Sequence, residues 1–181
     1  WVGHGLPVNF RQVIIYGALL GAGAPAERLE QLEVTVGAAL PVELRAFFSR
    51  HDGARSLGSY DLLPIEGVIG VWRDWNELLE DGGFGNGRKP KDRSGRLFQP
   101  VWWHRGWLPL AQDSGGNLLC VDLAPGPRGV RGQVLFWERE TGPEASGLPS
   151  IGAWLATFLQ GLQSGKYVVS EEGLLERRGG R

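Results

Sequence analysis

The 181-residue sequence has no methionine, one cysteine and three histidines, and these shortages exclude whole classes of site. A single cysteine, Cys120, excludes an internal disulfide, so nothing indicates an oxidising compartment. The histidines, His4, His51 and His104, are scattered, and none belongs to an H-x-H or H-E-x-x-H pattern. The sequence therefore predicts no metal site and no cofactor.

Long apolar runs and an excess of positive charge are also missing. No stretch of about 18 apolar residues occurs, which predicts that no helix spans a membrane. The 19 basic and 20 acidic residues give a net charge of −1, which removes the electrostatic case for nucleic-acid binding. The N-terminus lacks the basic and apolar segments of a signal peptide, so we expect a cytoplasmic protein. The absence of an initial methionine indicates a fragment or processed product and leaves an upstream segment open.

Glycine and tryptophan are abundant instead. The 29 glycines predict many turns and short elements, and the eight tryptophans each need to be buried or used in binding. Hydrophobic periodicity predicts helices over residues 25–37, 41–53, 66–81 and 151–162, the last of them capped by Ser150. Short apolar runs predict strands over 60–65, 107–112, 117–123 and 132–138, and a further strand or hairpin over 166–178. Both faces of the 117–123 run are apolar, which is typical of a central strand.

These elements predict an α+β fold in which helices pack around an antiparallel sheet. Residues 1–24 are interpreted as an arm or short helix, 25–175 as the domain and 176–181 as a tail. Residues 82–100, glycine-rich and then basic, are interpreted as a solvated loop.

No catalytic constellation emerges. Cys120 lies in LLCVDL, where a buried and inert thiol is the simpler interpretation. GGFGNG at 82–87 lacks the G-K-[ST] that a phosphate-binding loop requires. Asp113 and Asp122 could form a carboxylate pair, but any chain with 20 acidic residues offers such pairs. We therefore predict a protein that is not an enzyme.

Charge is uneven along the chain. Residues 60–81 hold six acidic residues and one basic residue, whereas residues 88–105 hold six basic residues and one acidic residue. Two interpretations remain open: solvated surfaces that pair with each other, or a polarised surface that selects a partner. In the second case the candidate residues are Asp74, Glu77 and Asp81.

The tryptophans also allow two interpretations, burial in the core or exposure at a binding surface. Trp137 and Trp154 fit core positions, and Trp72 and Trp75 face the core by helical periodicity. Trp102, Trp103 and Trp107 crowd the start of the first central strand. Because neighbours on an extended backbone point to opposite faces, we expect Trp102 or Trp103 to be exposed. An exposed tryptophan beside Arg105 would be an interface hot spot, and a plain packing role is the alternative.

Four blocks carry a resemblance to a known family: LPVELRAFFSRHDG, LLPIEGVIGVWRDWNELLEDG, VWWHRGWLPLAQDSGGNLLCVDLAPGPRGVRGQVLFWE and SIGAWLATFLQGLQSGKYVV. In order and spacing they resemble the SUKH superfamily, and best its branch with the fungal cell-wall-assembly regulator and many bacterial relatives. The resemblance covers about residues 25–175. It implies an α+β fold without a catalytic residue, and it matches Trp107, Asp113, Gly116, Asn117 and Asp122 to a strand-turn-strand block. Turn geometry and a hydrogen-bonded Asp122 would explain that block without any binding role.

Since bacterial members of this superfamily are mainly immunity proteins, the resemblance implies a protein that binds and neutralises a cognate bacterial toxin. A regulatory or scaffold module for cell-wall or secretion machinery is the first alternative. A carbohydrate binder that uses Trp102 or Trp103 as a stacking platform is the second. The predicted partner-binding residues are Trp102, Trp103, Trp107, Asp113, Asp122, Asp74, Glu77 and Asp81. The sequence does not give the oligomeric state.

Overall fold

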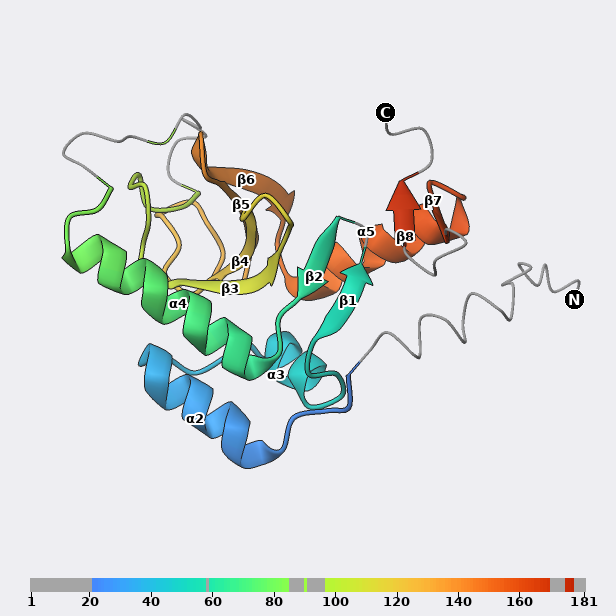
Figure 1. The fold of residues 1–181 in the computed structure, drawn as a ribbon, viewed down its shortest axis with the longest axis horizontal. Helices are drawn as coiled ribbons and strands as arrows, with labels where there is room; N and C mark the ends of the chain where they lie inside the picture. The colour runs from blue at the N-terminus through green and yellow to red at the C-terminus, as the bar shows by residue number, and fades with distance from the viewer. Residues whose placement is uncertain (1–20, 58, 85–89, 91–96, 170–174, 178–181) are drawn as a thin grey trace, which may run out of the picture.

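The computed structural model describes residues 21–57, 59–84, 90, 97–169 and 175–177. Within these residues the main sheet has six strands in the order β1-β2-β3-β4-β5-β6, and every neighbouring pair is antiparallel (Figure 1). The strands are β1 (Ala54–Leu57), β2 (Tyr60–Leu62), β3 (Trp107–Gln112), β4 (Leu118–Asp122), β5 (Val134–Glu138) and β6 (Gly142–Leu148). Spatial order therefore follows chain order, with α4 inserted between β2 and β3.

The described residues form four helices: α2 (Ala26–Val36), α3 (Val42–Phe48), α4 (Ile65–Glu80) and α5 (Ile151–Gln163). Helix α4 runs along the sheet and contacts β3, and α2 packs on the opposite side of α4 (Figure 1). Helix α5 contacts α3 and β6, and it leads to a separate hairpin formed by β7 (Tyr167–Val169) and β8 (Leu175–Arg177). Helices thus surround an antiparallel sheet, and the predicted α+β fold is confirmed.

Alternation of side chains along β4 divides the core into two parts. Leu119 and Val121 point into a larger cluster, the helical core, together with Leu32, Leu44 and residues from α4 and α5. Leu118 and Cys120 point into a second cluster, the aromatic core, whose buried members are Phe98, Trp102, Trp103, Trp107, Leu118, Cys120, Leu135 and Trp137. All five β4 residues are buried, which confirms the prediction of a central strand covered on both faces.

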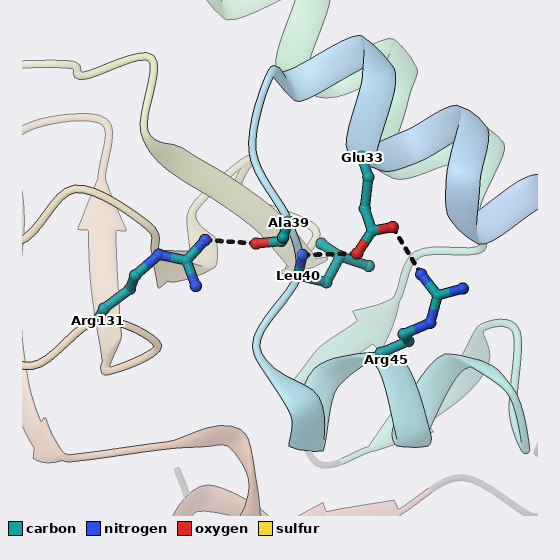
Figure 2. Close-up of polar contacts among 5 residues, drawn as sticks. All are labelled: Glu33, Ala39, Leu40, Arg45 and Arg131. Carbon is teal, nitrogen blue, oxygen red and sulfur yellow. Dashed lines mark hydrogen bonds and ion pairs between the residues drawn. The ribbon is translucent and has the colours of Figure 1, made fainter.

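One carboxylate joins the two N-terminal helices to each other. Glu33 on α2 accepts a hydrogen bond of 2.8 Å from the backbone N–H of Leu40 and lies 2.6 Å from the Arg45 guanidinium on α3 (Figure 2). Arg131, from the loop between β4 and β5, donates to the carbonyl of Ala39 in the same connection (Figure 2). These bonds hold the α2–α3 connection against the sheet.

Several element boundaries differ from the sequence prediction. The 41–53 helix ends at Phe48, because residues 48–53 turn to pair their backbone with residues 21–24. The 60–65 strand ends at Leu62, since Ile65 already begins α4. Strands β1 and β6 were not predicted, because ARSL and GPEASGL lack the apolar alternation of a strand. The predictions for residues 1–20, and for most of the basic part of the 82–100 loop, lie outside the described residues.

Candidate binding cleft

Two indole N–H groups fasten residues 102–105 to helix α4. Nε1 of Trp103 donates to Oδ1 of Asn76 at 3.2 Å, and Nε1 of Trp72 donates to the carbonyl oxygen of Arg105 at 2.8 Å. The guanidinium of Arg105 lies 2.7 Å from the carboxylate of Glu80. In the part of the two segments that the structure describes, the acidic helix and the basic segment therefore meet in the Arg105–Glu80 ion pair, as one of the two interpretations of the uneven charge expects.

The aromatic rings beside this attachment form a tightly packed group. Trp75 of α4 meets Trp137 of β5 edge to face at 4.3 Å between ring centroids, and its ring stacks on Phe84 at 5.6 Å. Trp102 meets Trp137 edge to face at 6.1 Å, and Nε1 of Trp137 donates to the Trp102 carbonyl oxygen at 2.7 Å. Such edge-to-face contacts fix the ring positions in addition to excluding water.

A cleft of about 650 Å³ opens over these rings, which is within the size range of ligand sites. Its walls come from the C-terminal part of α4, the turn between β3 and β4, and the turn after β5. The lining residues are Trp75, Leu78, Gly83, Phe84, Trp102, Gly115, Asn117, Trp137, Glu138, Arg139 and Glu140. The aromatic rings in the lining are buried or partly buried and are called the aromatic floor, whereas Glu138, Arg139 and Glu140 are exposed and are called the rim.

Asp113 shapes one wall of this cleft. Its carboxylate accepts hydrogen bonds from the backbone N–H groups of Gly115 (2.9 Å) and Asn117 (2.8 Å), and from the Asn117 amide (2.9 Å). The Oδ1 of Asn117 accepts in turn from the backbone N–H of Arg139 at 3.2 Å. The Asp113 side chain thereby fixes the β3–β4 turn and links it to the turn after β5.

The predicted acidic residues Asp74, Glu77 and Asp81 are all exposed. Their spacing of three and four residues places them in one stripe along α4. Leu78, 39% exposed, lies in the same stripe and also lines the cleft. The acidic stripe, defined as Asp74, Glu77 and Asp81, is therefore continuous with the lip of the cleft.

The expectation that Trp102 or Trp103 is exposed is wrong. Trp102, Trp103 and Trp107 are only 7%, 2% and 0% exposed, and all three belong to the aromatic core. The reason is local: residues 101–106 form bends and turns instead of an extended strand, so neighbouring side chains can point into the same cluster. The platform on which Trp103 would stack a sugar is consequently closed. The partner-binding roles of all eight predicted residues remain predictions.

Asp122 is buried at the far end of the β3–β4 hairpin from Asp113, since Asp122 pairs with Trp107 and Asp113 follows Gln112. The two carboxylates therefore do not form a catalytic pair. Asp122 accepts hydrogen bonds from Gln133 (2.9 Å) and from the Ala124 N–H (3.0 Å). Burial raises the pKa of Asp122 to about 6, while these hydrogen bonds oppose the shift.

The thiol of Cys120, the one candidate nucleophile considered from the sequence, is also buried. Burial raises the pKa of the Cys120 thiol well above its usual value, and the nearby Asp122 adds to the shift, which disfavours the thiolate a nucleophile requires. Across residues 21–57, 59–84, 97–169 and the other described positions, no cluster of three His, Cys, Asp or Glu side chains could hold a metal ion. The described part of the chain also contains no helix long and apolar enough to cross a membrane.

Residues 23–157 match the model of the SMI1 / KNR4 family (SUKH-1). The chain belongs to this family. The predicted membership of the SUKH superfamily is thereby confirmed.

Relatives of this SUKH-1 chain include proteins from several fungi. It is 26% identical to "KNR4/SMI1 homolog 2" of Debaryomyces hansenii over 86% of the chain and 34% of the relative. It is 27% identical to the "Glucan synthesis regulatory protein" of Neurospora crassa over 95% of the chain and 38% of the relative. It is 29% identical to the "Cell wall biosynthesis/cell cycle regulator smi1" of Schizosaccharomyces pombe over 83% of the chain and 33% of the relative. The chain thus spans about a third of the length of the curated relatives it matches.

These relatives correct the predicted function of the SUKH-1 chain. The prediction of a bacterial immunity protein that neutralises a toxin is wrong, because the matching proteins are fungal and named as regulators of glucan and cell-wall synthesis. The regulatory module, the first alternative from the sequence, agrees with them.

Sequence reasoning missed much of the cleft. Leu78, Phe84 and the turn residues Glu138, Arg139 and Glu140 come from segments far apart in the chain, and no local pattern joins them. Asn76 did leave a signal, because it lies four residues after Trp72 on a helix face that is otherwise apolar. A polar residue in such a position indicates a buried hydrogen bond.

Proposed function

We propose that this chain is a regulatory domain that acts by contacting another protein, in the control of cell-wall glucan synthesis. The observation that carries the proposal is its similarity, over nearly the whole chain, to a glucan synthesis regulatory protein and to cell-wall regulators of other fungi. The relatives are longer, so the chain would supply one domain of such a regulator.

The structure supports a domain that works through its surface. Cys120 and Asp122, two of the side chains considered above for catalysis, are buried in the fold. The exposed cleft is instead bordered by rigid turns and by the acidic stripe on α4. A preorganised surface of this kind lowers the entropic cost of binding a partner.

A chimera tests the proposal. The matching segment of the Neurospora crassa regulator, 38% of its length, is replaced by this chain in a strain that lacks the native protein. We expect glucan content and glucan synthase activity to recover towards the wild-type level. A second chimera with an unrelated domain of similar size serves as the control. If the chimera accumulates to normal levels and the cells still resemble the deletion strain, the proposal fails.

A further inference from the structure

We propose that the cleft binds a basic peptide segment of the partner protein, with an arginine or lysine side chain over the aromatic floor. The inference rests on the proposed function, since it assumes that the chain acts by contacting a protein. Three observations on the described residues carry it: the aromatic floor, the sign of the surrounding charge and the rigidity of the walls.

The aromatic floor suits a cation. Trp75 stacks on Phe84 with an angle of 8° between their planes and also packs against Trp103 and Trp137, so the partly buried Phe84 is the ring left to meet a cation. The faces of indole and phenyl rings attract guanidinium and ammonium groups, and the attraction grows when the pair is shielded from water. Trp102 and Trp137, at 7% and 1% exposed, close the base of the cleft and leave little ring surface for other uses.

Within the described part of the chain, the charge around the cleft is negative. Glu138 and Glu140 lie in its lining, and the acidic stripe of three carboxylates adjoins its lip through Leu78. The described cations of the same surface are Arg139, in the lining, Arg73, on α4, and Arg105, which is paired with Glu80. Among the described residues, six carboxylates against three guanidinium groups favour a basic occupant, both in steering its approach and in rejecting acidic competitors.

The walls are already in place before any partner arrives. Asp113 and Asn117 hold the two turns together by hydrogen bonds of 2.8 to 3.2 Å. Trp75, Trp103 and Trp137 fix the floor through edge-to-face or tilted contacts between 4.3 and 6.0 Å. A cleft that needs no rearrangement spends little binding energy on ordering itself.

The predicted ligand can be tested directly by selecting peptides that bind the full chain from a phage-displayed library. The library consists of random peptides about twelve residues long. We expect the enriched peptides to be rich in arginine or lysine. Their affinity, measured by fluorescence polarisation, should fall as ionic strength rises. Enrichment of acidic or uncharged peptides, or no enrichment at all, overturns the proposal.

Paired variants locate the binding to the cleft. Glu138→Gln together with Glu140→Gln removes two rim charges while keeping an acceptor for Thr141, and should weaken the selected peptide by about tenfold. The matched control, Glu27→Gln together with Glu30→Gln, removes two exposed charges on α2 and should leave the affinity within about twofold. Equal losses in both pairs would mean that overall charge, and not the cleft, binds the peptide.

A second pair addresses the aromatic floor. Phe84→Ala should lower the affinity for the selected peptide severalfold. Val34→Ala, at an 82% exposed position on α2, should leave that affinity unchanged. Circular dichroism of each variant confirms that the fold is retained. Titration of a β-glucan oligosaccharide in place of the peptide is the rival arm: if it binds and Phe84→Ala abolishes its binding, the cleft is a sugar site and the proposal is wrong.

The chimera separates this inference from the proposed function. If the wild-type chimera restores glucan synthesis and the Glu138→Gln, Glu140→Gln chimera restores it equally, the regulatory function stands and the peptide site is wrong. If the wild-type chimera fails while the isolated chain binds basic peptides in its cleft, the cell-wall function fails and the peptide site stands.

Discussion

Nε1 of Trp103 donates its hydrogen bond to the side chain of Asn76, 27 positions earlier in the chain, and both side chains are buried. The bond joins α4 to the segment that precedes β3. It also explains why Trp103, for which the sequence allowed an exposed position at an interface, lies inside the protein. The amide of Asn76 completes the link by donating to the Trp72 carbonyl at 2.8 Å.

Asn76→Ala should therefore destabilise the fold by about 1 to 3 kcal/mol, because it leaves the buried Trp103 N–H without its acceptor. Urea unfolding followed by circular dichroism measures the change. Asp74→Ala, on the exposed side of the same helix, should stay within about 0.5 kcal/mol of the wild type. Equal effects of the two substitutions would contradict the structural role of Asn76.

A pair of glycines tests the packing of Trp102. Gly142 has φ +81°, and a Cβ there would lie 3.0 Å from the Trp102 ring, whereas Gly147 has φ +74° with open space around it. Both Gly→Ala variants incur the strain of a left-handed backbone, about 1 to 2 kcal/mol. Gly142→Ala should lose about 1 to 3 kcal/mol more in thermal unfolding, because its methyl group overpacks the ring. A larger loss at Gly147 would refute this packing.

Part of the fold could be predicted from the sequence, because it depends on interactions between residues that are close together in the chain. Helices α4 and α5 follow from apolar residues repeated every three to four positions, and Ser150 caps α5 by accepting from the Ala153 N–H as expected. The burial of β4 on both faces follows from its unbroken apolar run.

The rest depends on contacts between distant segments. Strand β6 pairs with β5 despite its glycines and proline, since its register is set by the partner strand and by the Ser146 hydroxyl bonded to Val134. Trp102 and Trp103 share one cluster because a bend and irregular backbone, and not a strand, carry them. The regulatory function was still harder to predict from the sequence, because one fold serves several functions. Similarity to known proteins is what distinguishes between these functions.

Glu33 provides a test of the link between α2 and α3 that Figure 2 shows. Glu33→Ala removes the acceptor of the Leu40 N–H and the partner of Arg45, and should cost about 1 to 2 kcal/mol in urea unfolding. Glu33→Gln keeps an acceptor oxygen and should cost less. Glu30→Ala, one turn earlier and exposed, is the control and should be nearly neutral. A neutral Glu33→Ala would show that the connection is held by packing alone.

Asp122 gives the fold a defined pH dependence. Its pKa rises from 3.8 to about 6 in the folded protein, chiefly because burial disfavours the carboxylate. The folded state therefore binds the proton more tightly than the unfolded state between about pH 4 and about pH 6. The stabilising contribution of protonated Asp122 is complete below this window, declines as pH rises through it, and is absent above it.

Comparison with Asp122→Asn isolates this contribution, because asparagine does not titrate. The unfolding free energy of the wild type minus that of the variant should fall between about pH 4 and about pH 6, by up to roughly 1.4 kcal/mol per pH unit. Burial lowers the pKa of His104, which adds an opposite pH dependence, but the histidine is present in both proteins and its effect largely cancels. The measurement is urea unfolding at a series of pH values. A difference that rises with pH across the window would mean that the Gln133 and Ala124 hydrogen bonds outweigh burial and that Asp122 is held as a carboxylate.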